Sequence, residues 1–164
     1  MKRLLRHSSQ NYDELALDYM QAGLYNEAID IWQMAENEQA ASPMTYYYMG
    51  YAQSMLGRAS QAQSCFAKAE QTDSYCCFPN RLEDVMALEA AKTACPSSAR
   101  APYYLGCLYY DKRQYDLAVE NWEQSARLDP SFPTVWRNLA LACFNKNLPS
   151  APAEERKKRA QDYM

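Results

Sequence analysis

The sequence has a single histidine, His7, and only four glycines among its 164 residues. One histidine excludes catalytic and metal sites that need two or more imidazole groups. So few glycines leave little material for the glycine-rich loops that hold phosphate groups. No apolar run approaches the roughly 18 residues of a membrane span, and no apolar stretch follows the basic start. We therefore expect neither a membrane partner nor a secretory signal.

Charge of either sign is also modest. Lys and Arg number 17 against 20 Asp and Glu, which gives a net charge of −3. This mildly acidic balance lacks the basic footprint of a nucleic-acid binder, so no nucleic-acid partner is expected. Charged residues make up 23% and apolar residues 48% of the chain, a balance that is typical of a globular protein.

The six cysteines do not form a recognisable metal or redox motif. Cys76 and Cys77 are adjacent, whereas zinc and redox pairs are spaced by two residues. Cys65, Cys107 and Cys143 lie within helix-like patterns, which favours buried free thiols in a reducing compartment over a disulfide framework. We expect a cytoplasmic protein without metal or cofactor.

What the sequence does contain is an internal repeat of 34 residues. At this shift Gly23 falls on Gly57, Ala28 on Ala62, and Trp32 on Phe66, and in the second half Leu105 falls on Leu139. Gly50 and Gly106 lie further apart than one period, so the array is interrupted in the middle. A small residue at Gly50 or Gly106 lets the first helix of a pair approach its partner closely, and the large aromatics Trp32, Phe66 and Trp122 are expected to fill the space between the second helix and the next unit.

The third unit shows the full pattern, which consists of Leu105-Gly106, Tyr109, Ala118, Trp122 and Pro130. This pattern resembles the tetratricopeptide repeat over roughly residues 9–146. The resemblance implies an all-α fold: a right-handed superhelical solenoid of antiparallel helix pairs, with about three full repeats, a half repeat and a capping end. Segments 78–84, 101–106, 110–113 and 129–140 further resemble the repeat region of long bacterial proteins that carry a β-rich domain of unknown function.

The repeat predicts one domain over residues 1–164. Its parts are a repeat at 9–42, a repeat at 43–76, a half repeat with one helix at 77–98, a repeat at 99–132, and a partial repeat with a cap at 133–164. The expected helices are 10–22, 25–38, 43–56, 59–71, 81–94, 99–111, 115–127 and 133–145. Asn80 and Glu83 are spaced as in a capping box. An ordinary connecting helix remains an alternative to the half repeat, and a polar capping helix is expected at 153–160.

In this repeat family the first helix of each pair lines a concave groove. The resemblance places eight residues there as a peptide-binding groove: Tyr47, Tyr51, Met55, Tyr103, Tyr110, Asp111, Arg137 and Asn138. Tyrosine suits peptide recognition because it combines a large apolar surface with one hydrogen-bonding group. Asp13, Leu17 and Tyr48 occupy the slots where one subfamily carries a carboxylate clamp, so that clamp is absent.

No catalytic motif is present, and we expect a protein that is not an enzyme. The leading hypothesis is a scaffold that binds a protein or peptide segment in the groove. An alternative is an accessory repeat module of a larger bacterial protein, one that acts on carbohydrate, with no ligand of its own. A weaker option is a homo-oligomer formed through an exposed apolar face of the last helix around Leu139 and Phe144.

Overall fold

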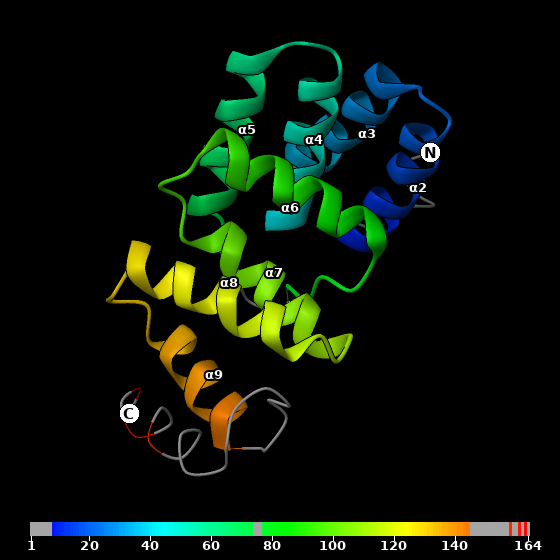
Figure 1. Ribbon diagram of the computed structural model, residues 1–164. Helices are drawn as coiled ribbons and strands as arrows, with labels where there is room; N and C mark the ends of the chain where they lie inside the picture. The colour runs from blue at the N-terminus through cyan, green and yellow to red at the C-terminus, as the bar shows by residue number, and fades with distance from the viewer. Residues whose placement is uncertain (1–7, 74–76, 145–157, 159–160, 162, 164) are drawn as a thin grey trace. The chain divides into compact units, whose positions relative to one another are not determined.

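The computed structural model describes residues 8–73 and 77–144, together with residues 158, 161 and 163. Over these residues the chain forms eight α-helices and no β-strand, which confirms the all-α prediction (Figure 1). The helices fall into two compact units. Unit 1 spans residues 1–77 with 93–95, and unit 2 spans 78–92 with 96–164.

Unit 1 consists of two helical hairpins (Figure 1). The helices are α2 (Ser9–Gln21), α3 (Tyr25–Asn37), α4 (Pro43–Met55) and α5 (Ala59–Gln71). The turns between paired helices use Gly23 and Gly57, whose φ angles are 78° and 73°. Glycine enters this left-handed region without a steric cost, so it ends one helix and reverses the chain within a few residues.

The interior of unit 1 is built from small residues opposite aromatic rings. Trp32 is fully buried and stacks on Tyr48 with ring centroids 5.7 Å apart. Ser42 and Thr45 form a reciprocal capping box at the start of α4. The Thr45 hydroxyl also donates a buried hydrogen bond of 2.9 Å to Asp13 on α2. Local capping and the contact between the two hairpins therefore share one hydroxyl group.

Unit 2 contains most of α6 (Leu82–Ala94), with α7 (Arg100–Asp111), α8 (Tyr115–Leu128) and α9 (Pro133–Phe144). The α7–α8 hairpin turns at Arg113, which adopts a φ of 60° where the first two hairpins use glycine. Trp122 is buried against α7, and its indole nitrogen donates to the Tyr103 carbonyl at 3.2 Å. α9 packs on α8 around the fully buried Val135 and Leu139.

The expected helices agree with the observed ones to within one residue at each end. At the start of α6, however, the cap shown by the structure is the Asp84 carboxylate. It accepts hydrogen bonds from the backbone N–H groups of Asn80 and Arg81 at 2.7 and 2.9 Å. The polar helix expected at 153–160 lies outside the described residues except for Lys158. None of the described helices has both the length and the apolar character needed to cross a bilayer.

Candidate protein-interaction site

In unit 1 the structure separates the three predicted groove residues of α4. Tyr51 is half-buried and Met55 is 51% exposed, and the two lie one helical turn apart on the same face. Burial and the nearby Tyr25 raise the pKa of Tyr51, so its hydroxyl stays protonated at neutral pH. Tyr51 and Met55 therefore form a small apolar face that carries one hydroxyl group.

Tyr47 was predicted in the open groove, and this prediction is wrong because its side chain is fully buried. The ring packs on Phe66 of α5 with centroids 6.4 Å apart, and its hydroxyl donates to Glu70 at 3.2 Å. Tyr47 precedes Gly50 by about one helical turn, so it points to the same side of α4 as the glycine that faces α5. It holds the hairpin together and does not reach a ligand.

In unit 2 a cleft of about 260 Å³ lies between α7 and α9. It is lined by Cys107, Tyr110, Trp122, Asn138 and Leu141, and we call it the α7–α9 cleft. It brings together the predicted residues Tyr110 and Asn138. Sequence reasoning missed Cys107 and Trp122 as lining residues. The helical spacing of Tyr103, Cys107 and Tyr110 could have revealed Cys107, because residues three and four apart share a face.

The walls of the α7–α9 cleft are apolar and carry a single amide group. The Tyr110 ring is held by Trp122 and Tyr115, with centroids 5.4 and 5.2 Å away, and Leu141 is 44% exposed. Asn138 Nδ2 lies 3.8 Å from Cys107 Sγ. Burial raises the pKa of the Cys107 thiol, so this group is neutral at physiological pH. The cleft therefore suits an uncharged apolar side chain next to a hydrogen-bonding backbone.

The remaining predicted residues of unit 2 lie around this cleft. Tyr103 is half-buried because its ring packs on Tyr104 and Phe132, with centroids 5.3 and 4.8 Å away. Arg137 is exposed one turn before Leu141 on α9. Asp111 is exposed at the end of α7 and lines a second hollow of about 300 Å³, together with Phe78, Pro79, Asn80, Cys107 and Lys112.

The homo-oligomer option assumed an exposed apolar face on the last helix around Leu139 and Phe144. At Leu139 this assumption is wrong, because its side chain is fully buried against α8. The side chain of Phe144 lies outside the described residues. A further hollow of about 380 Å³ between α8 and α9 is lined in part by Trp136 and Tyr163. Tyr163 donates to Glu123 at 2.7 Å and packs on Trp136. The chain's own residue 163 therefore covers part of the surface that α8 and α9 present here.

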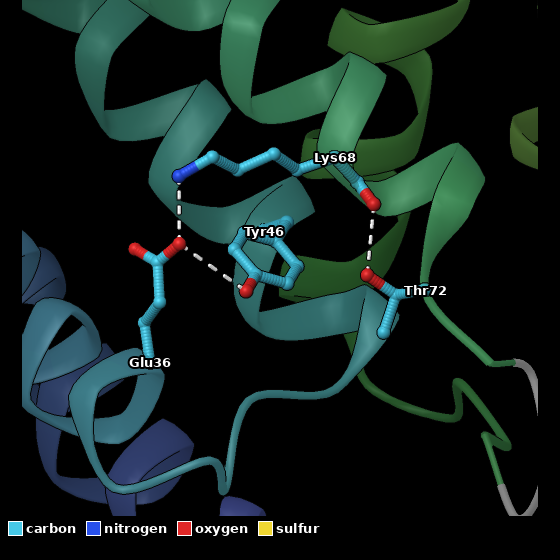
Figure 2. A network of polar contacts seen from close by, with 4 residues as sticks. All are labelled: Glu36, Tyr46, Lys68 and Thr72. Atoms are coloured by element: carbon cyan, nitrogen blue, oxygen red, sulfur yellow. Dashed lines mark hydrogen bonds and ion pairs between the residues drawn. The ribbon is translucent and has the colours of Figure 1, made fainter.

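A polar network joins three helices of unit 1 on its surface (Figure 2). Lys68 and Tyr46 both donate to Glu36 Oε1, at 2.6 and 3.4 Å, and the Lys68 ammonium lies 5.7 Å from the centre of the Tyr46 ring. The hydrogen bond to Glu36 raises the pKa of Lys68. The pKa of Tyr46 is raised mainly by burial and, to a smaller extent, by the charge of Glu36. The network connects α3, α4 and α5 and contains none of the predicted groove residues.

Residues 106–147 match the model of the family described as TPR repeat. This part of the chain carries a tetratricopeptide repeat. The match confirms the predicted resemblance over these residues, and it spans α8, α9 and the two α7 residues that line the cleft, Cys107 and Tyr110. Among the residues that the structure describes, no group of three His, Cys, Asp or Glu side chains is arranged to hold a metal ion.

Solved structures also match this chain, each at less than 25% identity and with a TM-score below 0.5. A crystal structure of MamA matches 99% of this chain and 83% of its own length, at 24% identity and a TM-score of 0.43. The MamA fragment from residue 41 of Desulfovibrio magneticus RS-1 matches 94% of this chain and 90% of its own length, at 20% identity and a TM-score of 0.41. YrrB, described as a TPR protein with an unusual peptide-binding site, matches 97% of this chain and 88% of its own length, at 15% identity and a TM-score of 0.39.

Proposed function

We propose that this chain is a non-catalytic scaffold that binds a peptide or protein segment, with the α7–α9 cleft as its main contact. The proposal rests on the residues that line this cleft. Tyr110 and Asn138, chosen from the repeat pattern, line one uncharged hollow together with the exposed Leu141. Small apolar hollows with one or two placed polar groups are typical of ligand recognition.

In this proposal an apolar side chain of the partner enters between Tyr110 and Leu141. The Asn138 carboxamide pairs with a backbone amide of the bound segment, since it offers both a donor and an acceptor. Asp111 and Arg137 carry opposite charges on the exposed surface near the cleft, where they favour one direction of the bound segment. Tyr51 and Met55 supply a separate contact face in unit 1.

The experiment is selection of a random twelve-residue phage-displayed peptide library on the full chain. The affinities of synthetic copies of the enriched peptides are then measured by fluorescence anisotropy. Leu141→Glu should weaken binding at least tenfold, because it places a charge in the apolar entrance, and Asn138→Ala should weaken it severalfold. Leu128→Glu is the matched control, since Leu128 is also an exposed leucine of unit 2 and does not line the cleft.

Two results would refute this function. Either no peptide is enriched, or Leu141→Glu and Leu128→Glu weaken binding equally. Self-association, the other predicted interaction, is checked by sedimentation of the wild-type chain over a range of concentrations. An unchanged sedimentation coefficient would exclude the homo-oligomer under those conditions.

A further inference from the structure

The hollow that contains Asp111 adjoins the α7–α9 cleft, because Cys107 lines both. We call it the Phe78 hollow. Phe78 forms its aromatic wall and is 80% exposed, the most exposed large apolar side chain among the described residues. The ring thus stands beside the proposed peptide site without being part of the protein interior.

The loop that carries Phe78 is held in place by a buried carboxylate. Asp84 is 2% exposed and accepts hydrogen bonds from the backbone N–H groups of Asn80 and Arg81. Pro79 is buried and fixes its own φ angle. These restraints act on the backbone within three residues of Phe78, so the loop has little backbone entropy left to lose when the ring meets a ligand.

The carboxylate that lines this hollow already holds an ammonium group. Lys112 Nζ lies 2.8 Å from Asp111 Oδ2, and the two side chains are 47% and 61% exposed. An exposed ion pair of this kind contributes little to stability because water and salt screen it. Lys112 can therefore swing into solvent when another cation arrives, and Asp111 then receives that cation.

On the basis of the proposed function, we propose that the Phe78 hollow binds a lysine or arginine side chain of the peptide whose apolar side chain fills the α7–α9 cleft. The face of the Phe78 ring attracts a cation, and the Asp111 carboxylate pairs with it. An acidic side chain would meet the electron-rich ring face and the Asp111 carboxylate, while Lys112, the cation of this hollow, is already paired with Asp111. Phe78, in the segment before α6, thus selects the charge of the partner together with Asp111 at the end of α7.

The test uses nine-residue synthetic peptides with leucine at the centre and with Lys, Arg, Glu or Gln at each other position in turn. Their affinities for the full chain are measured by fluorescence anisotropy. At one of these positions, the peptides with Lys or Arg should bind about three to ten times more tightly than the peptide with Gln. The peptide with Glu at that position should bind more weakly than the Gln peptide. Phe78→Leu should remove the preference, and Phe78→Trp should keep it because tryptophan is the strongest cation–π partner.

Two further variants separate the charge effects. Asp111→Asn should weaken the basic peptides and leave the Gln peptide unchanged. Lys112→Ala should tighten the basic peptides selectively, because it removes the internal competitor for Asp111. Weaker binding of basic peptides to Lys112→Ala, or a basic preference that survives Phe78→Leu, would overturn the inference.

The outcomes also separate this inference from the function on which it rests. If peptides bind and respond to Leu141→Glu but show no basic preference, the charge selection by Phe78 is wrong and the scaffold function stands. If none of the peptides binds, both proposals fail together.

Discussion

The indole ring of Trp122 on α8 lies directly against the backbone of Gly106 on α7, in space that any larger side chain at residue 106 would occupy. A Cβ atom built on Gly106 would overlap ring atoms of Trp122. Gly50 on α4 and Phe66 on α5 stand in the same relation in unit 1. In each unit, a glycine of the first helix admits an aromatic ring of the second.

Gly106→Ala should therefore destabilise the chain, although alanine is the better helix former by about 1 kcal/mol. We expect a net loss of about 1–3 kcal/mol in the free energy of unfolding, because the overlap is with a ring in a packed interior. Urea unfolding followed by circular dichroism measures it. In a Trp122→Leu background the step from Gly106 to alanine should cost less, since the smaller side chain leaves room for the methyl group. An alanine variant as stable as wild type would contradict this account.

The helix bounds and the close helix approach at Gly50 and Gly106 were predictable from the sequence because they depend on short-range spacing. The aromatic ring that meets each glycine comes from the neighbouring helix, and the sequence pattern placed it toward the next unit. The exposure of individual residues was harder to predict. Tyr47 and Leu139 belong to the groove and to the last helix in the repeat pattern, yet both are fully buried. Burial depends on what the neighbouring helix brings to the same place, and the pattern of one helix does not contain that information.

The site was predictable only in part for the same reason. Tyr110 and Asn138 belong to successive first helices, so the repeat predicts that they come together. Phe78 lies outside any repeat slot, and its place beside α7 depends on the cap at the start of α6. There the pattern of Asn80 and Glu83 favoured an ordinary capping box, whereas the structure uses the buried Asp84. The left-handed turn at Arg113 also has no glycine to reveal it.

The hydrogen bond between Thr45 and Asp13 should contribute measurably to unit 1. It is 2.9 Å long and buried, and it joins α4 to α2. Thr45→Val removes the hydroxyl while keeping the shape, and we expect a loss of about 1.5–3 kcal/mol in the free energy of unfolding. Thr45→Ser, which keeps the hydroxyl, should lose clearly less. A double-mutant cycle with Asp13→Ala measures the coupling, and additive losses would show that the two residues do not interact.

Unit 1 should lose stability at alkaline pH through the network in Figure 2. The pKa of Tyr46 is raised above 10.0 by burial and by Glu36, and that of Lys68 is raised above 10.5 by its hydrogen bond to Glu36. The folded chain holds both protons more tightly than the unfolded chain. The resulting stabilisation is complete below about pH 10 and is lost as the pH rises through the raised values.

Tyr46→Phe tests the tyrosine contribution. The fall in the free energy of unfolding between pH 9 and pH 11.5 should be smaller in this variant than in wild type. Between pH 7 and pH 9 the two proteins should differ by a constant amount, which serves as the internal control. Parallel curves over the whole range would mean that Tyr46 does not contribute to the pH dependence.

Asp84 should control both the start of α6 and the position of Phe78. Asp84→Ala leaves the backbone N–H groups of Asn80 and Arg81 without this acceptor, so we expect a loss of about 1–3 kcal/mol in the free energy of unfolding. Amide hydrogen exchange at residues 80 and 81 should accelerate more than exchange in α8. Glu120→Ala, at an exposed carboxylate of α8, is the control and should change stability by less than about 0.5 kcal/mol.

Because Asp84 restrains the loop and does not line the Phe78 hollow, its loss should reduce the preference for basic peptides while leaving the effect of Leu141→Glu unchanged. An unaltered preference would show that Phe78 is positioned by something other than this cap.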